Sequence, residues 1–207
     1  MKSVVVTGGI GSGKSAVCAL LRERGIPVYD CDAHTKDLYQ RRPSLVKRLE
    51  KALGSPLRQP DGCLDKGRLA ALIFSDDSAR ERLEAIVYPL VLQDYRRWQQ
   101  RFPDAPYCVL ESAVILSKPI FDGVADAVVL VEASEALRIQ RVQARDGLSR
   151  EEILRRMAAQ DIPVEKADVV LRNDGDKSAL SAAVEQVFFD KNAYLCKILE
   201  QEKNQIQ

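Results

Sequence analysis

The sequence has little of the chemistry on which several classes of protein depend. His34 is the single histidine among 207 residues, which excludes a metal site built on a pair of histidines and any mechanism that needs two of them. The five cysteines are widely spaced and form no C-x-x-C pair, which argues against a disulfide framework and against a structural zinc site. A reducing compartment, the cytoplasm, is therefore expected.

The sequence also lacks long apolar runs and an excess of charge of either sign. No run of about 18 apolar residues occurs, as a membrane-spanning helix would require. Met1 and Lys2 lead almost directly into a strand-like segment, so we expect no secretory signal peptide. The 31 Lys and Arg residues are balanced by 30 Asp and Glu residues, so the chain lacks the net charge that sequence-independent binding of nucleic acid relies on.

What the chain does have is enough apolar sequence, 46% of residues, to bury a core in one compact domain. Short apolar, mostly β-branched runs predict five parallel strands with helices on both faces of the sheet. The first two runs flank a predicted helix at 15–24, which makes a βαβ unit. The five predicted strands lie at residues 3–6, 26–29, 107–110, 127–131 and 168–171.

Helical patterns fill most of the remaining sequence. Residues 33–102 read as successive helices, and Pro89 should kink the amphipathic stretch 76–102 or split it into two helices. Ser149 and Glu152 have the spacing of a capping box, which predicts a helix from 150 to about 160. Residues 177–200 form one long helical pattern, and we expect the polar end 201–207 to fray.

The strongest signal is the run G-G-I-G-S-G-K-S at residues 8–15, which matches the phosphate-binding loop G-x-x-x-x-G-K-[ST]. It lies between a predicted strand and a predicted helix, as that loop requires. Its glycines let backbone N–H groups turn inward around phosphates, and the helix presents the positive end of its dipole. We expect Lys14 to reach the β- and γ-phosphates and the Ser15 hydroxyl to bind Mg²⁺.

Three carboxylates follow predicted strands, at the sheet edge where ligands of such folds bind. Asp30 and Asp32 follow the second strand, and Glu111 follows the third. A hydroxyl that accepts a phosphoryl group needs a carboxylate to orient it and to take its proton. An aspartate at this point can also simply cap the next helix, and the residues alone leave both interpretations open.

Arginines recur in the segment between the fourth and fifth strands. Arg138, Arg141 and Arg145 are spaced by three and four residues, so they share one helix face. That face is either a solvated cationic surface or part of a lid that closes over a nucleotide and neutralises its charge. His34 is expected at the surface or at a hinge.

Read together, these motifs resemble the dephospho-CoA kinase family. The resemblance begins with T-G-G-I-G-S-G-K-S at 7–15, D-C-D at 30–32 and D-G-C-L-D at 61–65. It continues through Gln140-Arg141, Arg145-Asp146, Gln160 and residues 167–173, so it covers nearly the whole chain. It implies a three-layer P-loop NTPase fold, and a cytoplasmic enzyme that transfers the γ-phosphoryl group of ATP, with Mg²⁺, to the ribose 3′-hydroxyl of dephospho-CoA. Small-molecule substrates and no obligate protein partner are expected.

The resemblance also implies a division of the chain and a set of site residues. The core is expected at about 1–32, 103–137 and 161–207, a helical substrate-binding insertion at about 33–102, and a small lid at about 138–160. Asp32 is the implied base, with Lys14 and Arg141 as the other catalytic residues. The implied ATP-binding residues are Gly11, Ser12, Gly13, Lys14, Ser15, Ala16, Arg141, Arg145 and Asn173. The expected substrate-binding residues are Thr7, Asp32, Lys66, Tyr88 and Glu111.

The sequence departs from the family pattern at three places. Tyr88 precedes Pro89 where the family usually has His, and Lys66 replaces the usual Arg. The common P-L-L-x-E after the third strand is V-I-L-S-K at 114–118, so Glu111 is the candidate for the missing carboxylate. A nucleoside or nucleoside-monophosphate kinase of the same fold is the alternative function. A nucleotide-switch module is disfavoured because the chain has no N-K-x-D motif for reading guanine.

Overall fold

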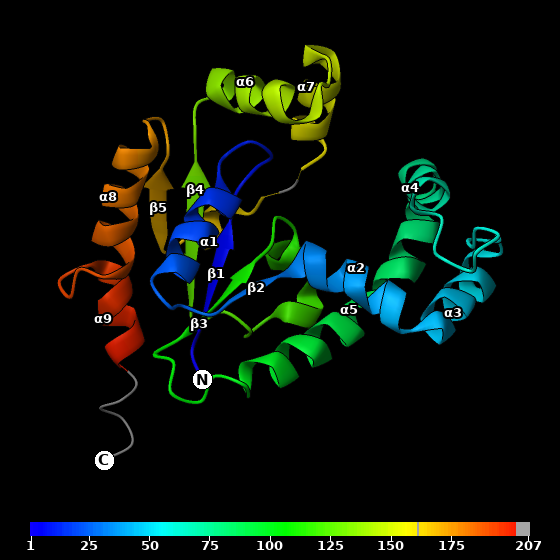
Figure 1. Ribbon diagram of the computed structural model, residues 1–207, viewed down its shortest axis with the longest axis horizontal. Coiled ribbons are helices and arrows are strands. Elements are labelled where there is room, and N and C mark those ends of the chain that lie inside the picture. Colours follow the sequence, from blue (N-terminus) through cyan, green and yellow to red (C-terminus); the bar gives the residue numbers. More distant parts are fainter. Residues whose placement is uncertain (161, 202–207) are drawn as a thin grey trace. The chain divides into compact units, whose positions relative to one another are not determined.

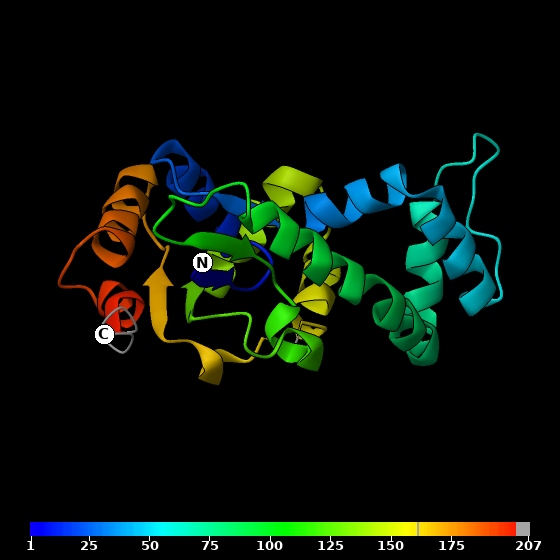
Figure 2. The ribbon, with the colours of Figure 1, turned by 90° about the horizontal axis from the view of Figure 1, so that it is seen from below.

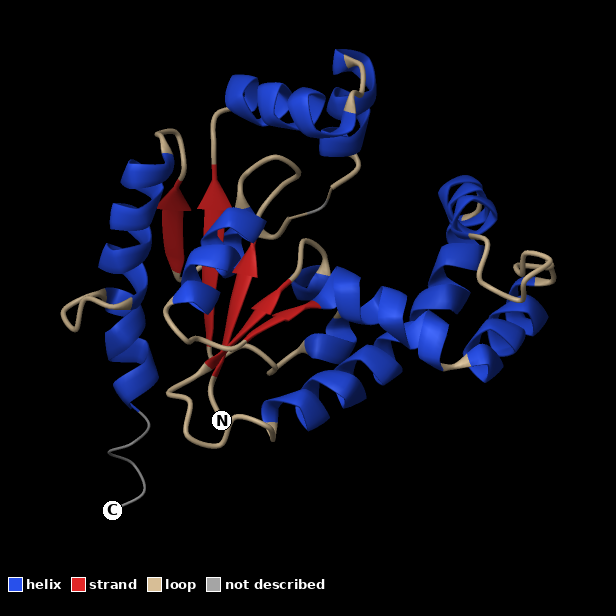
Figure 3. Ribbon diagram, viewed as in Figure 1, coloured by secondary structure: helices blue, strands red, loops and turns tan. Residues whose placement is uncertain are grey.

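The computed structural model describes residues 1–160 and 162–201. The chain divides into two compact units, Met1–Tyr29 with Phe102–Gln207, and Asp30–Arg101. In the described residues the whole sheet belongs to the first unit apart from Asp30, and the second unit is otherwise helices and loops (Figure 3). The expected start of the last core segment at residue 161 and the expected fraying after residue 201 fall on residues outside those described.

The first unit is built on a five-stranded sheet in the order β2-β3-β1-β4-β5. The central strand β1 pairs in parallel with β3 and with β4, and β4 pairs in parallel with β5 (Figure 1). Every residue of β1 is buried, and a strand covered on both faces of the sheet needs apolar side chains on both, which explains the run of Val4, Val5 and Val6. The predicted α/β fold with a five-stranded parallel sheet is confirmed. The strands are β1 (Ser3–Thr7), β2 (Val28–Asp30), β3 (Cys108–Glu111), β4 (Ala127–Glu132) and β5 (Val169–Arg172).

Five α-helices complete the described part of this unit. The helix α1 packs against α8, and a buried cluster joins their apolar faces to side chains of β1, β4 and α9. The helices α6 and α7 pack against each other around Ile139, Val142 and Ile153. The helices are α1 (Lys14–Glu23), α6 (Glu135–Asp146), α7 (Arg150–Ala158), α8 (Lys177–Phe188) and α9 (Tyr194–Gln201), and short 3₁₀ turns cover Ile115–Ser117, Pro119–Phe121 and Val164–Lys166.

Two predictions for this unit have different outcomes. The capping box is confirmed, because the Ser149 hydroxyl accepts the Glu152 N–H and the Glu152 carboxylate accepts the Ser149 N–H. The single helix expected over 177–200 is wrong, because the chain turns between α8 and α9. Asp190 makes that turn: its carboxylate accepts the N–H of Asn192 at 2.8 Å, and its carbonyl accepts the N–H of Ala193 at 2.9 Å. A side chain that bonds to the backbone locally competes with helix formation.

The second unit consists of four helices, in which the long helix α5 contacts the other three (Figure 2). Its buried residues recur at helical spacing, so one stripe of α5 faces the neighbouring helices. The four helices are α2 (Cys31–Arg41), α3 (Pro43–Leu53), α4 (Lys66–Ser75) and α5 (Asp77–Gln99). In the described residues of the whole chain, every helix is too short or too polar to cross a lipid bilayer.

Pro89 lies inside α5, and the alternative of two separate helices is wrong. Proline cannot donate to the carbonyl four residues earlier, that of Ala85, so one helical hydrogen bond is lost. Pro89 and Ala85 are both exposed, which leaves that carbonyl accessible to water. Val87 and Val91 are buried on either side of the proline, and this packing holds the helix together.

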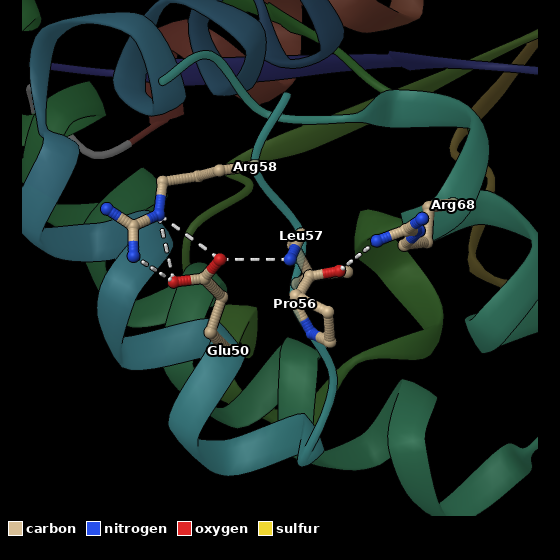
Figure 4. A network of polar contacts seen from close by, with 5 residues as sticks. All are labelled: Glu50, Pro56, Leu57, Arg58 and Arg68. Atoms are coloured by element: carbon tan, nitrogen blue, oxygen red, sulfur yellow. Dashed lines mark hydrogen bonds and ion pairs between the residues drawn. The ribbon is translucent and has the colours of Figure 1, made fainter. Parts of the chain in front are cut away.

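Polar contacts tether the loop between α3 and α4 (Figure 4). The Glu50 carboxylate accepts the Leu57 N–H at 2.9 Å and pairs with Arg58 at 2.8 Å. The hydrogen bond from Arg58, followed by the one from Leu57, holds the pKa of Glu50 below its ordinary value. Arg68 of α4 donates to the Pro56 carbonyl at 3.1 Å, so the first part of this loop is tied both to α3 and to α4.

Candidate active site

The phosphate-binding loop connects β1 to α1 as the sequence predicts. Gly11 and Gly13 have φ angles of 77° and 97°, which glycine adopts without strain. Gly13 is the N-cap of α1, and because it has no side chain it leaves the first N–H groups of the helix open toward an anion. Of the expected ATP-binding residues, Ser12 lies in the loop, and Lys14, Ser15 and Ala16 form the first turn of α1.

Lys14 folds along the loop that it follows. Its ammonium group donates to the Gly8 carbonyl at 2.6 Å and lies 3.4 Å from the Gly9 carbonyl. A lysine held there presents its charge to the space that the loop encircles. Thr7, expected to contact the substrate, is the last residue of β1 and is 2% exposed.

Ser15 and Glu111 meet beside the loop. The register of β1 and β3 pairs Glu111 with Val6, and the Ser15 hydroxyl donates to Glu111 Oε1 at 2.7 Å. Glu111 is 7% exposed, and its Oε2 accepts no hydrogen bond from any described residue. Arg22, one of its neighbours, approaches only to 3.9 Å. A buried carboxylate oxygen without a donor is costly, so this atom is suited to a cation.

Among the side chains of the site, Ser15 and Glu111 are the pair best suited to bind a magnesium ion. Mg²⁺ prefers oxygen ligands and is usually bound through one or two carboxylates together with substrate phosphates. Ser15 supplies a hydroxyl, and Glu111 supplies the carboxylate with the free oxygen. In the described residues no cluster of three or more His, Cys, Asp or Glu side chains could hold a metal by itself.

Arg141 and Asn173 close the other side of the loop. Asn173, 5% exposed, donates to the Ser12 carbonyl at 2.8 Å, and Arg141 Nη2 donates to the Asn173 carbonyl at 2.9 Å. A Cβ on Gly13 would lie 2.1 Å from the Asn173 amide nitrogen, so only glycine permits this approach. Arg141 Nη1 is buried without an acceptor among the described residues and points toward Gly13, 4.0 Å from that Cβ position. It is a donor available to an anion on the loop.

The other two arginines of α6, Arg138 and Arg145, make different contacts. Arg138 Nε donates to the Ile10 carbonyl at 2.9 Å, so it contacts the loop backbone. Arg145 is exposed and forms a two-point ion pair with its neighbour Asp146, at 2.7 and 2.8 Å. The structure therefore brings Arg138 and Arg141 to the loop and leaves Arg145 on the surface. No sequence motif singles out Arg22 as a neighbour of Glu111, although it lies seven residues after Ser15 on the same helix face.

A pocket of about 330 Å³ opens beside the loop. This volume is at the lower end of those typical for small-molecule sites. Two arginines and two carboxylates contribute to its walls, which suits a polar ligand. The residues that line it include Gly9, Ser12, Glu132, Ser134, Arg138, Arg172 and Asp174.

The remaining expected site residues belong to the second unit. Asp30 is the N-cap of α2, and its carboxylate accepts the Ala33 N–H at 2.9 Å. Asp32 is exposed in the first turn of the same helix. The structure thus identifies Asp30 as the capping residue and leaves the Asp32 carboxylate facing solvent.

Lys66 and Tyr88 lie on two different helices of this unit. Lys66 is exposed at the start of α4, directly after the N-cap Asp65. Tyr88 is half-buried on α5, and its hydroxyl donates to Glu84 at 3.1 Å. Burial, and then the negative charge of Glu84, raise the pKa of Tyr88, so this phenol is a donor rather than a base at neutral pH.

His34 is more constrained than a surface residue. Its Nδ1 lies 3.2 Å from the Asp94 carboxylate, and its ring meets Trp98 edge-on. It joins α2 to α5 inside the second unit, which is a structural role.

Comparisons with known proteins agree with this arrangement. A family model described as dephospho-CoA kinase matches residues 2–179. A dephospho-CoA kinase of Porphyromonas gingivalis is 39% identical over 161 residues, 78% of each chain. One of Geobacter sulfurreducens is 36% identical over 193 residues, 91% of this chain and 98% of the relative.

Solved structures show the same fold. A Thermus thermophilus protein is 38% identical with a TM-score of 0.77, over 89% of this chain and 94% of the other. A dephospho-CoA kinase of Campylobacter jejuni has a TM-score of 0.64 at 21% identity, over 90% and 96% of the two chains, a likeness of fold alone. Because the family model spans residues 2–179 and the relatives match most of their own length, the chain belongs to the dephospho-CoA kinase family.

Proposed function

We propose that the loop at residues 8–15 holds ATP and that Asp32 directs the acceptor hydroxyl in the reaction of this family. In that reaction ATP phosphorylates the ribose 3′-hydroxyl of dephospho-CoA, giving coenzyme A and ADP in the last step of coenzyme A biosynthesis. The observation that carries the proposal is the loop with its surroundings. An open helix N-terminus, the Lys14 ammonium and an unpaired nitrogen of Arg141 all lie at this loop.

Lys14 and Arg141 are assigned to the phosphoryl group. Phosphoryl transfer passes through a loose transition state with negative charge on the equatorial oxygens, so catalysis is mostly positioning and charge stabilisation. Lys14 reaches phosphates held by the loop, and Arg141 Nη1 supplies a buried donor beside Gly13. Burial strengthens such an interaction because less water screens it.

Mg²⁺ is assigned to Ser15 and Glu111. Bound with ATP, the ion would help to neutralise the charge that develops during transfer. Ser15 is the expected hydroxyl ligand, and Glu111, whose Oε2 accepts no hydrogen bond from the described residues, would serve as a direct ligand or as the acceptor for an ion-bound water. This assigns Glu111 to the ATP side of the reaction rather than to dephospho-CoA.

The second unit, at about 30–101, is assigned to dephospho-CoA, and the segment 138–160 to a lid over ATP. Asp32 is proposed to orient the 3′-hydroxyl and to accept its proton. Its carboxylate is exposed, whereas the carboxylate of Asp30 caps α2. Thr7, Lys66 and Tyr88 are proposed substrate contacts on the family pattern. Gly11, Ser12, Gly13, Ala16, Arg145 and Asn173 complete the proposed ATP site, with the nucleoside end extending toward the pocket beside Asp174.

The cytoplasm is the proposed compartment. None of the five cysteines forms a disulfide in the described residues, and two of them are open to solvent, Cys63 exposed and Cys196 half-buried. Free thiols persist in reducing compartments. ATP and dephospho-CoA are the partners that the family implies.

One assay tests the function directly. The purified full chain is given ATP and Mg²⁺ with dephospho-CoA, adenosine or a panel of nucleoside monophosphates, and ADP release is followed. Of these acceptors, only dephospho-CoA is expected to give ADP release, and the product should carry phosphate on the 3′-oxygen. The Lys14→Ala variant, prepared in the same way, corrects for contaminating kinases. Transfer only to adenosine or to a nucleoside monophosphate would replace the proposal with its alternative.

A further inference from the structure

The backbone of one loop residue, Ile10, is held at both of its polar groups by side chains from the lid segment. Its N–H donates to Gln160 Oε1 at 2.7 Å, and its carbonyl accepts from Arg138 Nε at 2.9 Å. Arg138 lies on α6, and Gln160 lies two residues after the end of α7. Both contacts are partly buried, and they link residues 150 and 128 positions apart in the sequence.

The Ile10 side chain adds a third contact. It packs against the apolar cluster of Ile139, Val142 and Ile153 that joins α6 to α7. The loop residue is therefore anchored by its side chain and by both backbone groups, all to the segment formed by α6, α7 and Gln160.

The approach of α6 to the loop is as close as glycine allows. A Cβ on Gly9 would lie 2.2 Å from Arg138 Nη2, and one on Gly11 would lie 2.6 Å from the Arg138 carbonyl oxygen. Removing the guanidinium would thus leave a gap directly above the loop. Burial lowers the pKa of Arg138 from its ordinary value, in agreement with a guanidinium enclosed between helix and loop.

A glycine-rich loop needs such support. Its glycines allow the conformation that binds phosphate, but they also allow many others, and this freedom must be lost when ATP binds. A contact that holds the loop in its binding shape beforehand lowers that cost and improves affinity without touching the ligand.

We propose that Arg138 and Gln160 are positioning residues that fix the phosphate loop through Ile10 and so set the affinity for ATP. The proposal rests on the proposed function only in taking the loop to be the ATP site. It also makes the loop and the lid one mechanical unit, because the lid segment cannot leave the loop without breaking these contacts.

The test uses two matched pairs of variants in the full chain. Gln160→Met removes the acceptor and keeps the length, whereas Gln160→Glu keeps an acceptor oxygen. Arg138→Met removes the donor, whereas Arg138→Lys retains a cationic one. Gln143→Met changes an exposed glutamine of α6 and serves as control. Circular dichroism melting verifies that each variant is folded.

The first readout needs no substrate. Hydrogen–deuterium exchange of the Ile10 amide in the nucleotide-free protein should quicken by about tenfold in Gln160→Met, since its acceptor is gone, and stay near wild type in Gln160→Glu and Gln143→Met. Unchanged exchange in Gln160→Met would overturn the proposal, even if the chain proved inactive toward dephospho-CoA.

The second readout is the division of the effect between KM and kcat. Losing one hydrogen bond should raise the KM for ATP by roughly 3- to 10-fold in each Met variant, with kcat within about twofold and recovery in Gln160→Glu and Arg138→Lys. The double Met variant should show less than the product of the two effects, because both side chains hold one residue. A large fall in kcat at constant KM, or effects that multiply, would overturn the proposal.

Discussion

The two aspartates at the start of α2 give a test in which stability and catalysis separate. Asp30 accepts the Ala33 N–H and caps the helix, whereas Asp32 is exposed in the first turn. Asp32→Asn keeps the size and removes the charge. A general base contributes about 10²- to 10⁴-fold to a rate, so kcat should fall by that factor, which at 1.36 kcal/mol per decade is about 2.7–5.4 kcal/mol.

The effect of Asp32→Asn on folding should be much smaller. An exposed acid in the first turn gains about 0.3–1 kcal/mol from the helix dipole, so the loss of unfolding free energy is at most about two fifths of the expected kinetic effect. In a chain of this length each kcal/mol moves Tm by about 2–4 °C. Asp30→Ala removes the cap and should cost about 1 kcal/mol with kcat retained, and Asp30→Asn should preserve both quantities because asparagine caps equally well.

The assay is ADP release with dephospho-CoA at saturating ATP, with ATP affinity measured by calorimetry and Tm by circular dichroism. Asp32→Asn should bind ATP normally and turn over slowly. The assignment of the base would be refuted by normal turnover of Asp32→Asn, or by an inactive Asp30→Asn whose Tm is unchanged. Either result would leave the assignment to the family untouched.

Three further predictions concern the loop, the metal site and the second unit. Lys14→Ala should abolish transfer without lowering Tm, because its ammonium group bonds to carbonyls of the phosphate loop at Gly8 and Gly9, and near-normal turnover would contradict its assignment. Glu111→Gln should raise the Mg²⁺ concentration at half-maximal rate by about 10- to 100-fold, since it removes the charge beside Ser15; an unchanged Mg²⁺ titration would remove Glu111 from the metal site. The folded pKa of Glu50 lies below its unfolded value, so its carboxylate stabilises the fold above about pH 4.3 and loses this effect as pH falls through the folded pKa. Urea unfolding should therefore find Glu50→Gln less stable than wild type at pH 7 and equal to it in strong acid, and a difference independent of pH would show that the ion pair with Arg58 contributes nothing.

The fold was predictable because its strands are short, apolar and separated by distinct helical patterns. The exact ends of the strands were not predictable. The second strand was expected at 26–29 and is found at Val28–Asp30, and the third includes Glu111. Apolar patterning reports burial, whereas a strand is defined by backbone pairing, and Glu111 pairs with Val6 although its side chain is charged. Likewise the break between α8 and α9 depends on the backbone contacts of Asp190, a single polar residue within an otherwise helical pattern.

Sequence patterns located the local part of the site and missed most of its long-range contacts. The loop motif is contiguous, so residues 8–15 could be identified from spacing alone. The contact of Asn173 with Ser12 joins positions 161 residues apart, and that of Glu111 with Ser15 joins positions 96 apart. Gln160 belongs to the family resemblance, but its contact with Ile10 could not be predicted from it, because a glutamine after a helix is ordinarily a solvated side chain. The roles of the site residues stay predictions until the variants are measured.

The central position of β1 has a consequence for folding during synthesis on the ribosome. This strand is made before its partners β3 and β4, which lie about a hundred residues later, in register from Cys108 and from Ala127. At a synthesis rate of about 5–20 residues per second, the nascent strand waits for about 5–20 seconds before β3, the earlier partner, exists. The helical unit Asp30–Arg101 is complete by then and has its own internal contacts, so it can fold while the first strand is still unpaired. The phosphate loop follows β1 directly, so it is made well before the strands that hold β1 in place, and the apolar residues Val4, Val5 and Val6 lack their sheet neighbours throughout that interval.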